Sequence, residues 1–161
     1  MSRDIAIYGR RKDVVPIADI LGELKKRKIA LTWKPSSRQV GSDWRGGRFH
    51  LEGTSETRND IIASTEPLDD DWRQDAVESH ADQLGDTERR VILSAKYIYN
   101  LHAPWSTAGG PEERPLIALA YTIADLADGI VVDTLTNKIY DRTAYRKANP
   151  WLAGETKRTK R

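Results

Sequence analysis

Residues 115–141 read PLIALAYTIADLADGIVVDTLTNKIYD, and this stretch decides the fold. Apolar side chains recur at helical spacing over 116–127, and so little of the helix circumference is polar that we expect it to be covered on more than one side. Gly129 is expected to end the helix as its left-handed residue. A short buried strand at 130–132, a tight turn at 136–138 and a last strand at 138–140 complete the stretch.

The N-terminal part predicts a strand, a helix and a second strand. The first strand is expected at 4–9, where apolar residues end at a glycine. Pro16 suits the first turn of a helix, and apolar residues then follow at i, i+3, i+4 and i+7. Cations at 25–28 suit the negative end of the helix dipole. A strand at 29–33 follows, so the order predicts a right-handed βαβ unit with a parallel strand pair.

Two further strands are expected in the middle of the chain, at residues 48–52 and 60–64. A helix is expected from Asp69, because three aspartates in its first turn suit the positive end of the dipole. Gly85 is expected to end that helix. Residues 89–101 are interpreted as a short helix up to Ala95 followed by a strand.

This alternation favours an α/β or α+β protein built on a single mixed sheet of about five to six strands, covered by about three helices. The N-terminal βαβ unit supplies the parallel part of the sheet. Because the C-terminal strands form a β-hairpin, the sheet cannot be wholly parallel. We expect residues 1–149 to form one α/β domain and residues 150–161 to form a basic C-terminal tail.

The composition is that of an ordinary globular protein, with 39% hydrophobic and 31% charged residues among 161. The sequence contains no cysteine and no run approaching the ~20 apolar residues of a membrane span. The N-terminus enters charged sequence without an apolar signal-peptide core. We therefore expect a cytoplasmic protein with no membrane partner.

Charge is divided into three blocks along the chain. Residues 1–48 carry 12 basic and 5 acidic side chains, residues 49–88 carry 2 and 12, and residues 89–161 carry 12 and 7, which gives +7, −10 and +5 and a net charge of +2. Such blocks can create opposed surface potentials that steer a charged partner. They can also neutralise one another within the fold.

Familiar catalytic and cofactor motifs are missing from the sequence. Gly9 follows a strand, but arginines and a lysine stand where a dinucleotide-binding loop needs glycines. The three histidines lie far apart and show no metal-ligand spacing. Consecutive helical residues point about 100° apart, so the aspartates at 69–71 are better explained by helix capping than by a metal site. We therefore expect no cofactor, no metal and no catalytic residue.

The strongest functional indication is a predicted loop in which two tryptophans alternate with four cations. Aromatic rings stack on single-stranded bases while cations hold phosphates. Tryptophan and arginine are equally the residues enriched as hot spots of protein interfaces. The indoles can also simply pack on the sheet. We predict the partner-binding residues to be Trp33, Lys34, Arg38, Trp44, Arg45 and Arg48, with Trp105 from a second loop.

The helix and hairpin predicted over residues 115–141 resemble the end of several uncharacterised small bacterial α/β proteins. Some of those proteins are immunity proteins encoded beside polymorphic toxins. The shared features are the alanine-rich helix, the glycine-led strand and the turn with its aromatic residue, about 27 of 161 residues. The resemblance implies a non-enzymatic protein that blocks its partner through a charged, aromatic surface. The acidic block would then suit a basic partner such as a nuclease toxin.

Three functions follow from these observations. The first is a non-catalytic protein-binding module, with an immunity-type inhibitor of a bacterial toxin as one form. The alternative is a nucleic-acid-binding protein that uses the Trp/Arg-rich loop. The third is a small hydrolase with a site around His102, which requires a concave pocket that holds His102 with a carboxylate within hydrogen-bond reach. The oligomeric state is left open.

Overall fold

The computed structural model describes residues 2–36, 44–104, 111 and 113–152. In these residues one open sheet has the strand order β2-β3-β4-β5-β1-β6-β7, and every neighbouring pair is antiparallel. The strands are β1 (Arg3–Gly9), β2 (Leu31–Pro35), β3 (Gly46–Leu51), β4 (Ile61–Pro67), β5 (Tyr97–Ala103), β6 (Gly129–Asp133) and β7 (Lys138–Tyr140).

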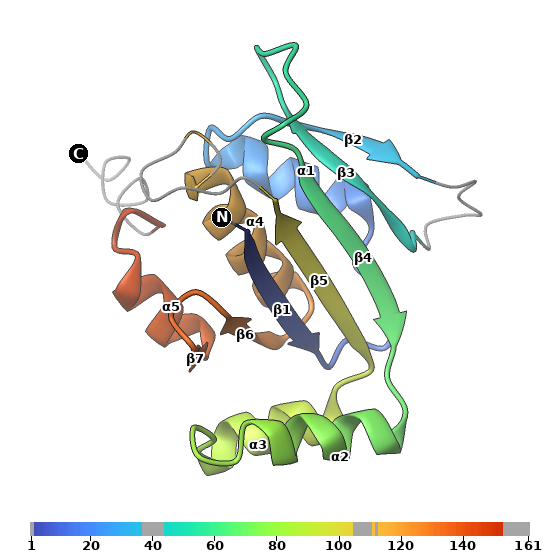
Figure 1. Cartoon of the computed structure of the whole chain (residues 1–161), viewed down its shortest axis with the longest axis vertical. Coiled ribbons are helices and arrows are strands. Elements are labelled where there is room, and N and C mark those ends of the chain that lie inside the picture. Colours follow the sequence, from blue (N-terminus) through green and yellow to red (C-terminus); the bar gives the residue numbers. More distant parts are fainter. Residues whose placement is uncertain (1, 37–43, 105–110, 112, 153–161) are drawn as a thin grey trace.

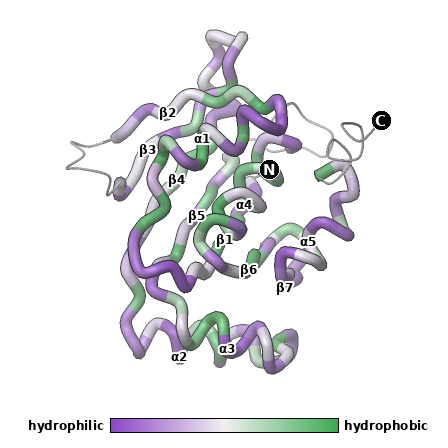
Figure 2. Tube along the Cα trace, turned by 180° about the vertical axis from the view of Figure 1, so that it is seen from behind, coloured by the Kyte–Doolittle hydropathy of each residue, from purple (hydrophilic) through white to green (hydrophobic). Residues whose placement is uncertain are grey.

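The helices lie on two sides of this sheet. They are α1 (Ile17–Lys26), α2 (Asp70–Ser79), α3 (Asp86–Ser94), α4 (Glu113–Leu126) and α5 (Arg142–Ala148). Helix α4 packs across β1, β5 and β6, and α1 and α5 pack against α4. Figure 1 shows the face of the sheet opposite to the one that α4 covers, so that α1 and α4 lie behind the strands. Figure 2 shows the molecule from behind, with α4 in front of the strands. Helices α2 and α3 form a hairpin below the strands in Figure 1.

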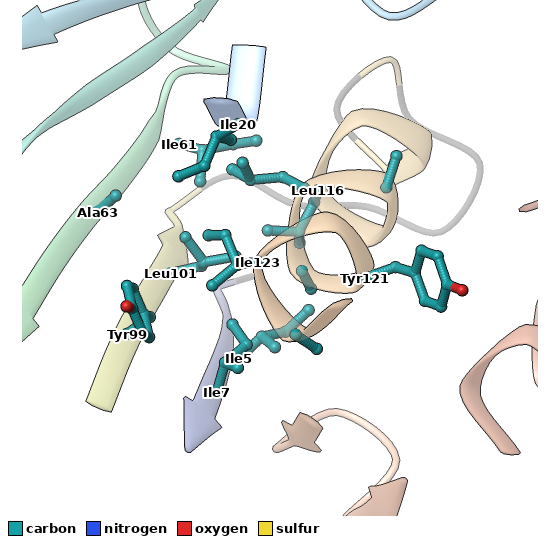
Figure 3. Close-up of a cluster of buried hydrophobic side chains, with 14 of the residues drawn as sticks. Ile5, Ile7, Ile20, Ile61, Ala63, Tyr99, Leu101, Leu116, Tyr121 and Ile123 are labelled. Carbon is teal, nitrogen blue, oxygen red and sulfur yellow. The ribbon is translucent and has the colours of Figure 1, made fainter. Parts of the chain in front are cut away.

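The main core lies between the sheet and α4. Alternate residues of the strands point to this side, so that Ile5 and Ile7 of β1 and Leu101 of β5 are buried beneath the helix. Figure 3 shows Leu116 and Ile123 of α4 facing these strands. An antiparallel sheet that buries one face in this way produces the period-two pattern of its strands.

Helix α4 is buried on all sides. Nine consecutive residues, Leu116–Ala124, have buried side chains. Tyr121 points away from the sheet in Figure 3, and the guanidinium of Arg27 lies 5.0 Å from the centre of its ring. The expectation that this helix is covered on more than one side is thus confirmed, because the sheet covers one side and α1 and α5 cover the other.

A second, smaller core lies on the opposite face of the sheet. Helix α3 contacts β1 and β6, and α2 packs against α3. The buried members of this core are Tyr8, Leu68, Val77, Val91, Ile92, Ala95, Ile98, Ile130 and Val132. The α2–α3 hairpin therefore covers one end of this face.

The structure confirms an α+β fold on a single sheet and corrects the predicted topology. Seven strands and five helices are described, where five to six strands and three helices were expected. No parallel pair occurs among the described strands, so the sheet is not mixed. Strands β1 and β2 are separated by β3, β4 and β5, so the N-terminal βαβ parallel pair was wrong. The C-terminal hairpin of β6 and β7 is confirmed.

Both helix-ending glycines play other roles than predicted. The left-handed residue after α4 is Asp128, with φ 53°, and Gly129 is already the first residue of β6. A Cβ at Gly129 would lie 2.3 Å from the carbonyl oxygen of Tyr8, so close strand approach explains this glycine. Gly85 stands at the N-cap of α3, because α2 ends earlier, at Ser79.

More of the chain after β7 packs on the core than the sequence predicted. Helix α5 was not predicted, and the Asp141 side chain caps it by accepting from the backbone N–H of Ala144. Leu152, placed in the predicted tail, is buried, and its carbonyl accepts from Arg27 at 2.7 Å. Residues 153–161 lie outside the described chain. Over the residues described, no helix is long and apolar enough to cross a membrane.

Candidate functional site

The face of the sheet opposite α4 is only partly covered. The α2–α3 hairpin packs over one end of it, and the rest of the face shows no helix packed on it in Figure 1. The register places one cross-strand row of side chains there, because residues opposite one another in antiparallel strands share a face. That row is Lys34, Arg48, Ile62, His102 and Asp4.

The predicted partner-binding residues divide between the two faces. Trp44 has no exposed surface, and its Nε1 donates to the carbonyl oxygen of Val15 at 2.8 Å. The half-buried ring of Trp33 packs on the same core, 5.1 Å from Trp44 and 4.8 Å from Phe49 between ring centres. The two indoles that the sequence interpretation placed in an exposed loop therefore belong to the core.

The cations of the same segment are exposed. Lys34 and Arg48 stand opposite each other on β2 and β3, on the uncovered face, and Arg45 precedes β3. The structure thus brings Lys34 and Arg48 together and separates them from the two tryptophans. Arg38 and Trp105 lie outside the described residues, so their predicted role stays a prediction.

In the same row, His102 and Asp4 form a close pair. Nδ1 of His102 lies 2.5 Å from Oδ1 of Asp4, and the side chains are 41% and 56% exposed. Asp4 is positioned by Thr134, whose hydroxyl donates to the Asp4 carbonyl oxygen and accepts from its backbone N–H, at 2.7 and 3.2 Å. With Nδ1 donating to the carboxylate, Nε2 keeps a free lone pair. This arrangement suits a general base.

This pair lines a concavity of about 270 Å3, which we call the His102 pocket. Its polar lining includes Asp4, His80, Asn100, His102 and Thr134. The described residues contain no group of three or more His, Asp and Glu side chains placed to hold one metal ion. His80 lines the pocket together with the His102–Asp4 pair.

A second concavity, of about 260 Å3, lies between α2 and the sheet, and we call it the Trp72 pocket. Tyr8 and His80 line both pockets, so the two concavities adjoin. The remaining lining residues are Leu68, Trp72, Asp75, Ala76, Ser79 and Ile98. Trp72 is 47% exposed, and the other tryptophans among the described residues are buried or half-buried.

Helix α2 and the turn into α3 are acidic, whereas the next residues of α3, Arg89 and Arg90, are exposed cations. Residues 69–88, which we call the acidic hairpin, contain eight acidic residues and one basic residue, Arg73. Seven of the eight are exposed, and Glu88 is half-buried. Within the described chain the hairpin forms one ion pair, between Arg73 and Asp70 at 2.7 Å. The acidic block therefore gathers largely unpaired on one projecting element.

Sequence reasoning missed Asp4, Tyr8, Trp72 and His80 as site residues. Asp4 and Tyr8 carried a usable signal, because they alternate with the apolar residues of β1 and so point to the opposite face. Nothing in the sequence said that α2 would fold back beside that face. Comparisons with protein-family models, curated proteins and solved structures found no match, so the site rests on its own geometry.

Proposed function

We propose that the chain is a non-catalytic protein-binding module whose acidic hairpin binds a basic protein. The observation that carries this proposal is the set of exposed carboxylates on α2 and the turn after it, of which Asp71, Asp75 and Asp82 form no ion pair with described residues. An inhibitor of a basic toxin, of the immunity type, is one protein of this kind. Its binding surface would be this hairpin rather than the Trp/Arg-rich segment.

The charge distribution supports binding more than stabilisation of the fold. Like charges on one helix repel each other, so an unpaired acidic hairpin costs folding free energy that a basic partner recovers on binding. Complementary charge also raises the association rate and suppresses wrong partners. Beside these carboxylates, Trp72 offers an exposed indole of the type found in interface hot spots.

The test is capture of partners from nuclease-treated lysate of the native host, with wild type and two matched double variants. Asp71→Asn/Asp82→Asn removes two charges from the acidic hairpin. Asp13→Asn/Asp19→Asn removes two exposed charges elsewhere, and Asp19, like Asp71, lies in the first turn of a helix. We expect a basic protein that the first variant retains less well than the second does. Equal retention by both variants, or an acidic partner, would count against the proposal.

A second candidate is a small hydrolase, favoured by one observation: His102 lies in a concave pocket with the Asp4 carboxylate 2.5 Å away. In that reaction Nε2 of His102 would take a proton from water, and the water oxygen would attack the substrate. The same imidazole would then return the proton to the leaving group. Activated ester and phosphodiester substrates test this, with His50→Gln as the control for His102→Gln. Equal rates for wild type and His102→Gln would end this candidate.

Of the residues predicted to bind nucleic acid, the described cations are exposed, but the two tryptophans predicted to stack on bases are packed in the core. Lys34, Arg45 and Arg48 are exposed and can reach phosphates. Trp33 and Trp44, the rings meant to stack on bases, pack instead on the covered side of the sheet. We therefore rank it below the other two.

A further inference from the structure

The Trp72 pocket has a chemistry that differs from the rest of the surface. Its lining combines the apolar residues Leu68 and Ile98 with the aromatic residues Trp72 and Tyr8. Asp75 supplies a carboxylate that makes no ion pair with described residues. At about 260 Å3 the pocket is smaller than the sites of drug-sized ligands and suits a single side chain.

Tyr8 is the second indication of a ligand. Its side chain is only 8% exposed, and among the described residues its hydroxyl has no hydrogen-bond partner. Because the hydroxyl itself still reaches solvent and Tyr8 lines two adjoining pockets, it is available to a bound group. Burial raises the pKa of Tyr8 and keeps the phenol neutral, and a neutral phenol can donate a hydrogen bond as well as accept one.

These groups together favour a planar cation. Trp72 and Asp75 stand three residues apart on α2, so their side chains are neighbours, about 5–6 Å apart at Cβ. A guanidinium can stack on an indole ring while it donates to a carboxylate, and an ammonium ion stacks less well. Ser79 and the Tyr8 oxygen offer further acceptors. The surrounding acidic hairpin attracts a cation and repels an anion.

We propose that the Trp72 pocket binds an arginine side chain of the basic partner, with the guanidinium between the Trp72 ring and the Asp75 carboxylate. This rests on the proposed function and deepens it, because it names the residue type that the acidic hairpin recognises. The exposed carboxylates would attract the partner, and the pocket would fix its orientation. A single arginine in an aromatic, acidic pocket is the form that interface hot spots commonly take.

The proposal is tested with the full chain and two small probes, by NMR. Methylguanidinium carries the charge, and methylurea has nearly the same shape without it. We expect methylguanidinium to shift the Trp72 indole N–H and the amides of α2 saturably, and methylurea to leave them unchanged. Trp72→Ala and Asp75→Asn should each weaken methylguanidinium binding about threefold or more. Trp72→Phe should retain part of the affinity, and Asp19→Asn, in the first turn of α1 and outside the acidic hairpin, should retain nearly all of it.

The outcomes separate this inference from the proposed function. If methylurea binds as well as methylguanidinium, or if Asp75→Asn binds it normally, the arginine pocket is wrong. A basic partner lost in Asp71→Asn/Asp82→Asn would then still support the protein-binding module. If methylguanidinium binds as expected while no basic partner is captured, the pocket stands and the proposed function fails. Because Trp72 is exposed, circular dichroism of Trp72→Ala should match wild type, which keeps a loss of binding interpretable.

Discussion

Nδ1 of His50, on β3, lies 2.7 Å from Oδ1 of the buried carboxylate of Asp60. Its other ring nitrogen, Nε2, lies 2.7 Å from the carbonyl oxygen of Thr54. An ionised carboxylate and a carbonyl both only accept hydrogen bonds, so both ring nitrogens must carry a proton. This geometry therefore favours the imidazolium form of His50, which ties the β3–β4 connection to the sheet.

This contact predicts a pH-dependent stability. The hydrogen bond to Asp60 and then the bond to Thr54 raise the pKa of His50. The folded state thus holds the proton more tightly, so the contribution is complete below the unfolded pKa of about 6.5 and is lost as pH rises through the folded pKa. We expect wild type to exceed His50→Gln in free energy of unfolding by an amount that shrinks as pH rises above the unfolded pKa of about 6.5 and through the raised pKa of the folded state. Denaturant unfolding across this range measures the difference, which a constant offset would contradict.

The same substitution should have very different effects on stability at two tryptophans. Trp44 is fully buried and donates to Val15, so Trp44→Ala should cost about 3–5 kcal/mol through its cavity and the unpaired carbonyl. Trp72 is 47% exposed, so Trp72→Ala should change stability by no more than about 1 kcal/mol. Urea unfolding compares the two variants directly. A stable Trp44→Ala protein would show that this indole does not belong to the core.

Two glycines form a second matched pair. Gly129 lies against β1, and a Cβ there would meet the Tyr8 carbonyl oxygen at 2.3 Å, so Gly129→Ala must separate β6 from β1 and should cost about 1–3 kcal/mol or more. Gly22 lies in α1 with nothing within 4 Å of an added Cβ, so Gly22→Ala should stabilise the protein by about 0.5–1 kcal/mol. Thermal unfolding should therefore move in opposite directions. A neutral Gly129→Ala would mean that the two strands are less tightly apposed.

The elements with a clear period were predictable, and their arrangement was not. The pattern over 116–127 predicted α4, and the apolar residues after Pro16 predicted α1, because each face is fixed by local spacing. Strand order depends instead on contacts between distant segments. The sequence of a strand, a helix and a strand suggested adjacent parallel partners for β1 and β2, yet three strands lie between them. Local spacing carries no information on that separation.

The candidate site shows the same limit at the level of single residues. Composition identified the acidic block and the cations Lys34 and Arg48, which are exposed. It could not say that the alternation of β2 turns Trp33 toward the core and Lys34 away from it, since the strand boundary decides the face. Tyr8 and Trp72 line one pocket only because α3 packs on β1 and α2 packs on α3, and β1 is far from both helices in sequence.

The buried pair of Arg3 and Asp133, whose chain neighbours Asp4 and Thr134 bond to each other, carries a last prediction. Arg3 Nη2 lies 2.6 Å from Asp133 Oδ2, and the side chains are only 8% and 2% exposed. Arg3→Met would leave the carboxylate buried without its partner, which should cost about 3–5 kcal/mol. Arg3→Met/Asp133→Leu removes both charges and should recover much of that loss.

The double variant should also keep the His102–Asp4 contact, because Thr134 still bonds to the Asp4 backbone on the open face. An unchanged His102 imidazole signal by NMR would show this. If the signal instead changes in the double variant, Arg3 is needed to position the His102 pocket as well as to stabilise the sheet.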